Sequence, residues 1–173
     1  MKRFKSAVAH LKDERVWVFP LVEWPRSPYA IGTCIATHST PLDHAELGTS
    51  LLAAMQVYQR PMTEEERIKG YDPQRAMGYR SNRKWSRDLG SVYVSWKVSD
   101  DGTATFSITP HRAEGLNLFP VPEARVLLDN NVTPAEIGEQ VMKVLTLSQS
   151  LNGGPDAPRK APPRKSRSRA QAS

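Results

Sequence analysis

Two stretches decide the fold: "DHAELGTSLLAAM" at residues 43–55 and "TPAEIGEQVMKVL" at residues 133–145. Each opens with a residue that can cap free helix amides, has Glu three positions later, and continues with Leu or Ile, Gly and an apolar stripe at helical spacing. In this capping-box pattern, the cap side chain and the Glu side chain satisfy backbone amides reciprocally. The sequence therefore predicts one amphipathic helix over residues 43–59 and a second over residues 134–149.

Both predicted helices contain an internal glycine, Gly48 or Gly138, directly after the Leu or Ile. Glycine inside a helix costs about 1 kcal/mol relative to alanine, so a packing role is expected to compensate for it. We expect each helix to approach either the sheet or the other helix closely. Equivalent packing roles are enough to explain the repeated formula. An internal duplication is possible, although the strands between the two helices do not repeat convincingly.

The remaining apolar segments alternate in the manner of strands. Pro20 within the first of them predicts an edge position or a bulge. "DDGT" at residues 100–103 predicts a tight hairpin, in which Gly102 supplies a positive φ. Pro110 is expected to end the second strand of that hairpin. The expected strands cover residues 15–24, 29–37, 91–99, 103–110 and 124–128.

Together these segments predict an α+β fold, in which a mainly antiparallel sheet of about five strands packs against two principal amphipathic helices. A single globular domain is expected over residues 1–154, because a chain of this length can bury a hydrophobic core of its own. Trp85 and Leu89 are the expected apolar anchors of the polar stretch between the first helix and the hairpin.

The net charge of +6 is concentrated at the C-terminal end. Residues 155–173 contain six Lys and Arg residues against one Asp, a net of +5, which leaves +1 for the rest. This Pro- and Arg-rich segment has no aliphatic residue larger than Ala, so a flexible, disordered tail is expected. It is either an electrostatic arm for a nucleic acid or acidic surface, or a solvated appendage without a dedicated partner.

The chain has no apolar run of the roughly 20 residues that a membrane helix needs, and no signal peptide is expected. Its one cysteine, Cys34, excludes an intramolecular disulfide and is typical of a reducing compartment. A cytoplasmic location, with no membrane partner, is the resulting expectation.

The sequence offers little for catalysis. Its four histidines form no metal-binding motif, no glycine-rich phosphate loop is present, and no cofactor or metal is expected. On a strand, Cys34 and His38 would lie too far apart for a nucleophile–base pair. "HRAE", with His111 as base, Arg112 as phosphate clamp and Glu114 as metal ligand, could be imagined as a nuclease strand end. More often such a sequence is the polar exit of a hairpin, so a binding protein is favoured.

Several elements follow one another in an order that resembles a known family. The first element is a helix that contains Leu-Gly, and a polar stretch that ends in a Lys-aromatic pair follows it. Next come a hairpin whose second strand ends in I-x-P-x-R-x-x-G and a strand with the pattern V-x-L. The last element is a helix that begins with [ST]-P-x-E-[IL]-G. The matching residues are Leu47, Gly48, Lys84, Trp85, Ile108, Pro110, Arg112, Gly115, Thr133, Pro134, Glu136, Ile137 and Gly138. Over roughly residues 40–150, the chain resembles the CdiI-type immunity proteins of bacterial contact-dependent growth inhibition.

This resemblance implies a cytoplasmic antitoxin without chemistry of its own. It would bind the C-terminal toxin domain of a cognate CdiA effector, often a nuclease such as a tRNase, and cover its active or substrate-binding site. Two alternatives stay open: a small RNA-associated protein that binds through the basic C-terminal arm, and a nuclease or hydrolase centred on His111. Apart from that arm, no nucleic-acid partner is expected.

A nuclease usually presents a cationic face to nucleic acid, so its inhibitor should offer carboxylates and aromatics. The candidate toxin-binding residues are the acidic and aromatic residues of the polar stretch that are expected to be exposed, together with a second acidic set at the hairpin tip. "EEER" is also typical of an ordinary solvated helix face with Glu–Arg pairing. The candidates are Glu64, Glu65, Glu66, Tyr71, Asp72 and Tyr79, and then Asp100 and Asp101.

Overall fold

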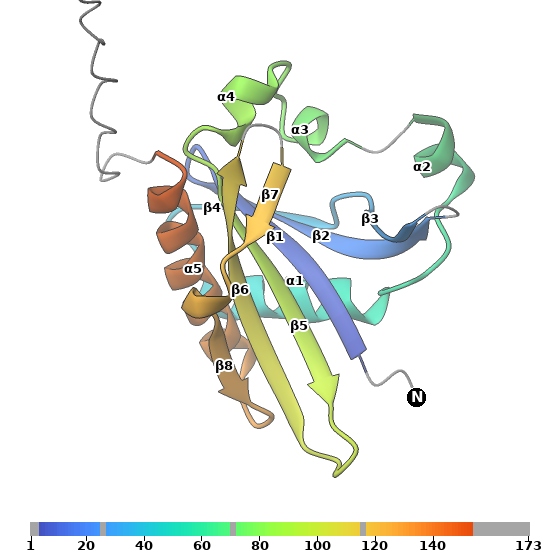
Figure 1. Ribbon diagram of the computed structural model, residues 1–173, viewed down its shortest axis with the longest axis vertical. Helices are drawn as coiled ribbons and strands as arrows, with labels where there is room; N and C mark the ends of the chain where they lie inside the picture. Colours follow the sequence, from blue (N-terminus) through green and yellow to red (C-terminus); the bar gives the residue numbers. More distant parts are fainter. Residues whose placement is uncertain (1–3, 25–26, 70–71, 115–116, 154–173) are drawn as a thin grey trace, which may run out of the picture.

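Figure 1 shows the computed structural model of the chain, which describes residues 4–24, 27–69, 72–114 and 117–153. The strands are β1 (Phe4–Lys12), β2 (Arg15–Trp24), β3 (Ser27–Ile31), β4 (Ala36–Ser39), β5 (Gly90–Val98), β6 (Ala104–Glu114), β7 (Asn117–Pro120) and β8 (Val126–Asp129). The helices are α1 (His44–Gln56), α2 (Glu64–Lys69), α3 (Pro73–Ala76), α4 (Asn82–Ser86) and α5 (Pro134–Leu151), with a 3-10 turn at Pro122–Ala124.

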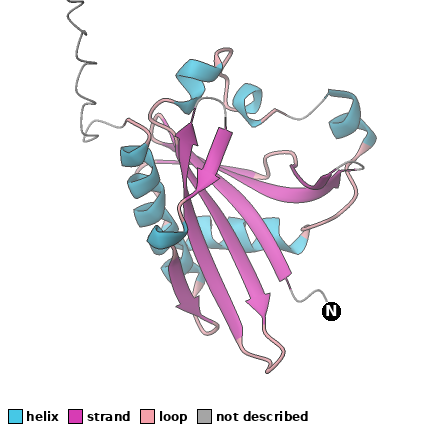
Figure 2. Cartoon of the chain, in the orientation of Figure 1, coloured by secondary structure: helices cyan, strands magenta, loops and turns pink. Residues whose placement is uncertain are grey.

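The strands form one eight-stranded sheet with the order β3-β2-β1-β5-β6-β7, in which β4 also pairs with β2 and β8 with β6. Helices α1 and α5 lie behind this curled sheet in the view of Figure 2. The main core lies between them and includes Ala7, Val18, Leu51, Val94 and Leu145. We call the helix-covered side of the sheet its inner face and the opposite side its outer face. The predicted α+β fold with an antiparallel sheet and two long helices is confirmed.

Both long helices begin after the predicted cap residue, but among the described residues the reciprocal bond of the Glu side chain is present at α5 and not at α1. Asp43 caps α1, because its carboxylate accepts from the backbone amides of Ala45 at 2.7 Å and Glu46 at 3.1 Å. Thr133 and Glu136 form the predicted capping box at α5. The Thr133 amide donates to the Glu136 carboxylate at 2.7 Å, and the Glu136 amide donates to the Thr133 hydroxyl at 3.3 Å. The predicted buried positions of α5, among them Ile137 and Val141, are in the core.

The strand pairing shows that the chain is built as an internal repeat. Arg15 pairs with Ser39 and Val18 with Ala36 between β2 and β4. The pairs Thr105–Asp129 and Ile108–Val126 between β6 and β8 are the same pairs moved by 90 positions, from 15 to 105 and from 39 to 129. Repeat 1 (residues 4–56) and repeat 2 (residues 90–151) therefore each have the order ββββα, and residues 57–89 connect them.

A proline occupies the same place in each repeat. On the edge of β2 that faces away from β1, the paired strand changes at Pro20 from β4 to β3. On the edge of β6 that faces away from β5, the paired strand changes at Pro110 from β8 to β7. The Pro20 carbonyl accepts from the Gly32 amide at 2.9 Å, and the Pro110 carbonyl accepts from the Val121 amide at 2.8 Å. The backbone nitrogen of each proline therefore faces the gap between two short strands, so the absence of its N–H removes no hydrogen bond of the sheet.

The repeats are related by an approximate two-fold axis. Ala7 pairs with Pro20 and Val92 with Pro110, which makes Val8 and Tyr93 equivalent positions. Val8 pairs with Tyr93 where β1 meets β5, so the axis passes between these two residues. A Cβ added at Gly48 would lie 1.8 Å from the Pro134 carbonyl oxygen of α5.

The reciprocal contact is also present, since a Cβ added at Gly138 would lie 1.9 Å from the His44 carbonyl oxygen of α1. His44 and Pro134 are the first residues of their helices. The two glycines therefore let α1 and α5 cross at their first turns, with each backbone pressed against the other. The expected close approach is confirmed, and its target is the other helix. The internal duplication left open by the sequence is visible in the topology and register.

Several strand predictions need correction. β1 was not predicted, because its outer face carries polar residues such as Ser6, His10 and Lys12, although all three are buried. The segment expected as one strand at residues 29–37 is divided between β3 and β4. Strand β6 continues past Pro110 to Glu114, because Pro110 still pairs with Val92 of the neighbouring strand β5. Pro20 likewise lies in a strand with neighbours on both sides, at a change of partner rather than at a sheet edge. The β2–β3 register shifts between Val22 and Trp24, so an irregularity, the other expectation for this segment, is present close to Pro20.

The described residues therefore contain eight strands instead of the predicted five or so, mainly because the short strands beside β2 and β6 come in pairs. No helix among the described residues is long and apolar enough to cross a membrane.

Candidate functional site

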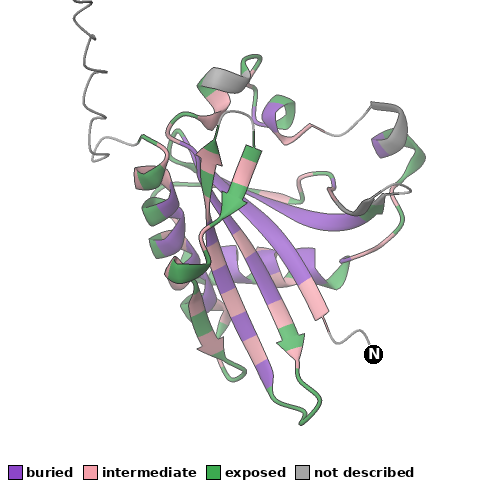
Figure 3. Ribbon diagram, viewed as in Figure 1, coloured by how far each residue is buried: buried purple, intermediate pink, exposed green. Residues whose placement is uncertain are grey.

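The outer face of the sheet differs between the two repeats. In repeat 1, Trp17 and Phe19 form a second apolar cluster with Met77 and Leu89 of the connecting segment. Trp85 packs against this cluster, so both predicted anchors of the polar stretch are confirmed. In Figure 3, β1 is buried along most of its length, whereas β6 alternates between buried and partly exposed residues. The connecting segment therefore covers repeat 1 on its outer side.

In repeat 2, the corresponding outer positions are polar and partly exposed. With the 90-position offset, Trp17 corresponds to Ser107, and Phe19 corresponds to Thr109. Ser107 and Thr109 are half-buried, and neighbouring Leu127 on β8 is 60% exposed. The two repeats thus share an inner face and differ on the outer one.

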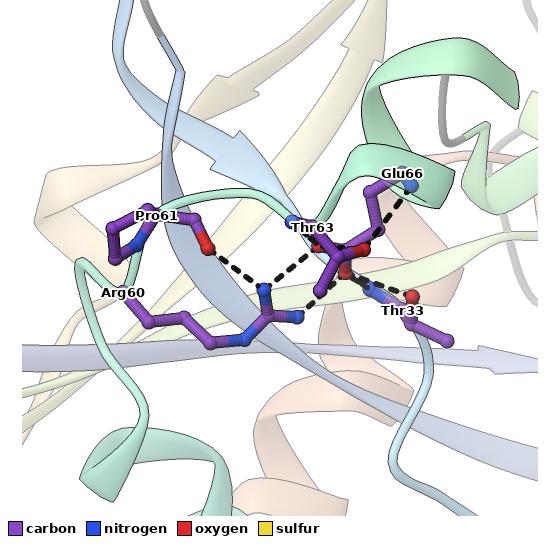
Figure 4. Close-up of polar contacts among 5 residues, drawn as sticks. All are labelled: Thr33, Arg60, Pro61, Thr63 and Glu66. Carbon is purple, nitrogen blue, oxygen red and sulfur yellow. Dashed lines mark hydrogen bonds and ion pairs between the residues drawn. The ribbon is translucent and has the colours of Figure 1, made fainter.

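The buried Glu66 is the centre of a partly buried polar network that holds α2 to the loop between β3 and β4 (Figure 4). Its carboxylate accepts from the Arg60 guanidinium at 2.6 and 2.7 Å. The amide and hydroxyl of Thr33 donate to the same carboxylate at 2.9 and 2.8 Å, and the amide of Thr63 donates at 2.9 Å. These bonds join the connecting segment to the chain between β3 and β4.

The network also fixes the ionisation state of Glu66. The hydrogen bonds from Arg60 hold the pKa of the Glu66 carboxyl far below its usual range, and the donors from Thr63 and Thr33 act in the same direction. The same pairing raises the pKa of Arg60. Glu66 is only 4% exposed, so the prediction that it belongs to an exposed acidic set is wrong. The Glu run gives no sign of this difference, because the partners Thr33 and Arg60 lie outside it.

The other candidates on the connecting segment have different surroundings. Glu64 and Glu65, in the first turn of α2, are exposed. Asp72 is half-buried and caps α3 by accepting from the Gln74 amide at 3.0 Å. Tyr79 is half-buried, and its hydroxyl donates to the Asp13 carboxylate. Tyr71 lies outside the described residues, as does the predicted tail at residues 155–173.

Asp100 and Asp101 are exposed at the tip of the β5–β6 hairpin, as predicted. Asp101 accepts from the Thr103 amide at 2.9 Å, which lowers the pKa of the Asp101 carboxyl. Gly102 has the expected positive φ of +85°. In Figure 1 the hairpin tip is at the bottom of the molecule and α2 is at the upper right. The structure therefore does not bring the two predicted acidic sets together.

His111 participates in a polar contact between strands. Its Nδ1 is 3.0 Å from the Ser91 hydroxyl, and its backbone carbonyl accepts from the Ser148 hydroxyl of α5 at 2.6 Å. Burial lowers the pKa of His111 to about 4. Ser91 is completely buried, so a substrate could not reach its hydroxyl in this conformation. The geometry fits a link between β5, β6 and α5.

His10 is a buried histidine that the sequence did not single out. It is completely buried, packs against Phe19 and Trp85, and neither ring nitrogen has a hydrogen-bond partner among the described residues. Burial, together with the charge of His111, lowers the pKa of His10 to about 3. The ring is therefore neutral at physiological pH and fills space in the apolar layer under the connecting segment.

The other sequence candidates for chemistry are separated from one another. Cys34 Sγ contacts the Ala36 carbonyl, whereas His38 Nε2 is 3.0 Å from the Ser50 hydroxyl. Arg112 forms an ion pair of 2.5 Å with Glu114 on the surface. Within the described ranges, no group of three or more His, Cys, Asp or Glu side chains could hold a metal ion.

Comparison with known proteins gives matches at the level of the fold. No protein family matches the sequence, and no curated protein is significantly similar to it. A solved protein of unknown function from Neisseria meningitidis has a TM-score of 0.60 and 18% identity, covering 86% of this chain and 96% of that one. A chain of a CdiA-CT/CdiI toxin and immunity complex from Yersinia pseudotuberculosis has a TM-score of 0.59 and 17% identity, covering 84% of this chain and 97% of that one.

Proposed function

We propose that the protein is an immunity protein, an antitoxin of the CdiI type. It binds the C-terminal nuclease toxin domain of its cognate CdiA effector, a tRNase, and covers the active or substrate-binding site. The observation that carries this proposal is the fold shared with a chain of a toxin and immunity complex over 97% of that chain. The element order from Gly48 to Gly138, which resembles CdiI proteins, supports it independently.

The buried polar groups support a role in binding without catalysis. Ser91, His111 and Glu66 are all engaged inside the fold, where they hold elements together. An inhibitor needs a rigid surface that complements its target, and tight protein inhibitors reach dissociation constants of order 10⁻¹³ M. A cytoplasmic location follows from the proposal, because a tRNase acts there.

Exposed carboxylates are the proposed contacts with the cationic face of the toxin. Glu64, Glu65, Asp100 and Asp101 are exposed and can make such contacts directly. Asp72, the cap residue before α3, and Tyr79, which follows α3, are half-buried and would contribute their exposed edges. Tyr71 completes the proposed set. Glu66 would act indirectly, because its network with Arg60 positions α2.

The proposal is tested by co-expressing the chain with the C-terminal domain of the effector encoded immediately upstream. The wild-type chain should co-purify with that domain and restore growth. Reversing two charges with Glu64→Lys and Glu65→Lys should slow association, because steering between opposite charges is lost. Glu123→Lys, at another exposed carboxylate, is the matched control. Failure of the wild-type chain to bind or protect would refute the proposal.

The second candidate is an RNA-associated protein, which the net charge of +5 in residues 155–173 favours. A chain that ends at Gly153 separates the two functions. An immunity protein should protect as well without the basic segment, whereas an RNA-binding protein should lose most of its salt-sensitive affinity.

A further inference from the structure

The outer face of repeat 2 is the largest difference between the two otherwise equivalent halves. We define this face by Thr105, Ser107 and Thr109 of β6 and Leu127 of β8. Register places them next to one another, because Ser107 pairs with Leu127 and Thr105 with Asp129. In repeat 1 the connecting segment covers the equivalents of Ser107 and Thr109, which are Trp17 and Phe19, whereas the equivalents of Thr105 and Leu127, Arg15 and Thr37, are exposed. The two repeats therefore differ at Ser107 and Thr109, where the sheet is covered in repeat 1 and partly exposed in repeat 2.

We propose that the outer face of repeat 2 is the surface on which the toxin domain docks, with the β5–β6 hairpin tip at one end of the footprint. This inference rests on the proposed function and adds the location of the interface. The toxin domain would take the place on repeat 2 that residues 57–89 take on repeat 1.

The residues of this face are more typical of a surface that a partner covers than of one that only solvent contacts. The outer positions of antiparallel sheets are commonly polar when they face solvent. Here Leu127 replaces the polar Thr37 of repeat 1, and Leu127 is 60% exposed. Its cross-strand partner is the short, half-buried Ser107, and beyond Ser107 the residues Ser95 and Ser6 on β5 and β1 are already buried. A partner can therefore reach Leu127 over the short side chain of Ser107.

The charges at this end of the sheet fit a cationic partner. Asp100, Asp101 and Asp129 are exposed there, against two exposed cations, Lys97 on β5 and Arg125 directly before β8. The hairpin projects beyond α1 and α5 in Figure 1, so these carboxylates are presented without a covering helix. A nuclease domain binds phosphates through basic residues, and a matching acidic surface would both steer and block it.

The surface area of this face reaches that of a standard interface only when the tip of the β5–β6 hairpin is included. A stable interface buries about 800 Å² on each partner, more than four residues of a sheet supply. The footprint therefore extends from Thr109 along β6 to the hairpin tip. Contacts at Asp100 and Asp101 then belong to the same footprint, and they should contribute more to binding than Glu64 and Glu65 of α2.

The test measures the affinity of purified full-length variants for the C-terminal domain of the upstream-encoded effector. Ser107→Arg and Thr109→Arg place a bulky cation in the proposed footprint. Each should weaken binding roughly 30-fold or more, the effect of losing a hot spot. Thr146→Arg, on an exposed position of α5, is the control and should stay within roughly threefold of the wild type.

Leu127→Lys provides a variant that keeps the fold, because its side chain is already exposed. It should also weaken binding, and urea unfolding should show unchanged stability. Wild-type binding together with unchanged affinity of the Leu127, Ser107 and Thr109 variants would overturn the docking surface and leave the immunity function intact. Failure of the wild-type chain itself to bind would overturn both.

Discussion

Repeat 1 and repeat 2 have the same topology and the same helix crossing, and they share a register where β2 pairs with β4 and β6 with β8, yet their outer faces differ. Trp17 and Phe19 lie under the connecting segment, whereas Ser107 and Thr109 are partly exposed at the equivalent positions. The comparison shows that the inner face and the two glycines maintain the scaffold. The outer face is free to close on the chain itself or to serve another molecule.

The largest effect on stability is expected when a residue of one repeat is replaced by its equivalent from the other repeat. Phe19→Thr places the residue of repeat 2 in repeat 1, where Phe19 is completely buried. Loss of a buried Phe costs about 3–5 kcal/mol of unfolding free energy. Thr109→Phe on the partly exposed face should change stability by less than about 1 kcal/mol. Urea unfolding measures both, and equal costs would show that repeat 2 is packed on its outer side as well.

The glycine pair tests the symmetry of the helix crossing. Gly48→Ala and Gly138→Ala should each destabilise the fold by about 1–3 kcal/mol, since the added methyl groups would lie 1.8 and 1.9 Å from carbonyl oxygens of the other helix. The two costs should be similar and less than additive in the double variant, because both substitutions separate the same helices. Thermal unfolding is the measurement. Stabilisation by about 1 kcal/mol, the ordinary helix preference for alanine, would contradict the close crossing.

Glu66→Gln tests whether the Glu66 network attaches the connecting segment to repeat 1. Removing the charge leaves the Arg60 guanidinium without its ionic partner, and a loss of about 2 kcal/mol is expected. Hydrogen exchange of the α2 amides should accelerate along with this loss. Glu64→Gln is the matched control on the exposed side of α2 and should stay within about 0.5 kcal/mol. Equal effects of both substitutions would show that the network does not hold α2.

The smallest effect at neutral pH is expected for His10→Leu, because His10 is neutral there and neither ring nitrogen has a partner among the described residues. The pKa of His10 falls from 6.5 in the unfolded chain to about 3 in the fold, so between these values the unfolded chain binds the extra proton. Wild-type stability should therefore fall as the pH drops below 6.5, by up to roughly 1.4 kcal/mol per pH unit from this group.

His111, with a pKa of about 4, adds to the same acid loss. His10→Leu should flatten the stability profile between pH 6.5 and 4 while leaving the His111 contribution in place. Urea unfolding at a series of pH values measures the slope. A variant with the wild-type slope would show that His10 is protonated in the folded protein.

The sequence predicts the inner half of this molecule better than the outer half. The capping residues, the apolar stripes and the alternation in β5 are local signals, and the helices and the hairpin follow from them. Strand β1 escapes prediction because Ser6, His10 and Lys12 are buried by distant residues. Glu66 was placed on the surface for the same reason, since its partner Thr33 lies 33 positions away. The duplication became visible only through strand register.

The most direct test of the immunity function is a titration of the upstream effector's purified C-terminal domain with the wild-type chain, following RNA cleavage. Cleavage should fall linearly to zero at one molar equivalent, where a one-to-one complex forms, and the chain alone should cleave nothing. Undiminished cleavage at several equivalents, or turnover of RNA by the chain alone, would contradict the account.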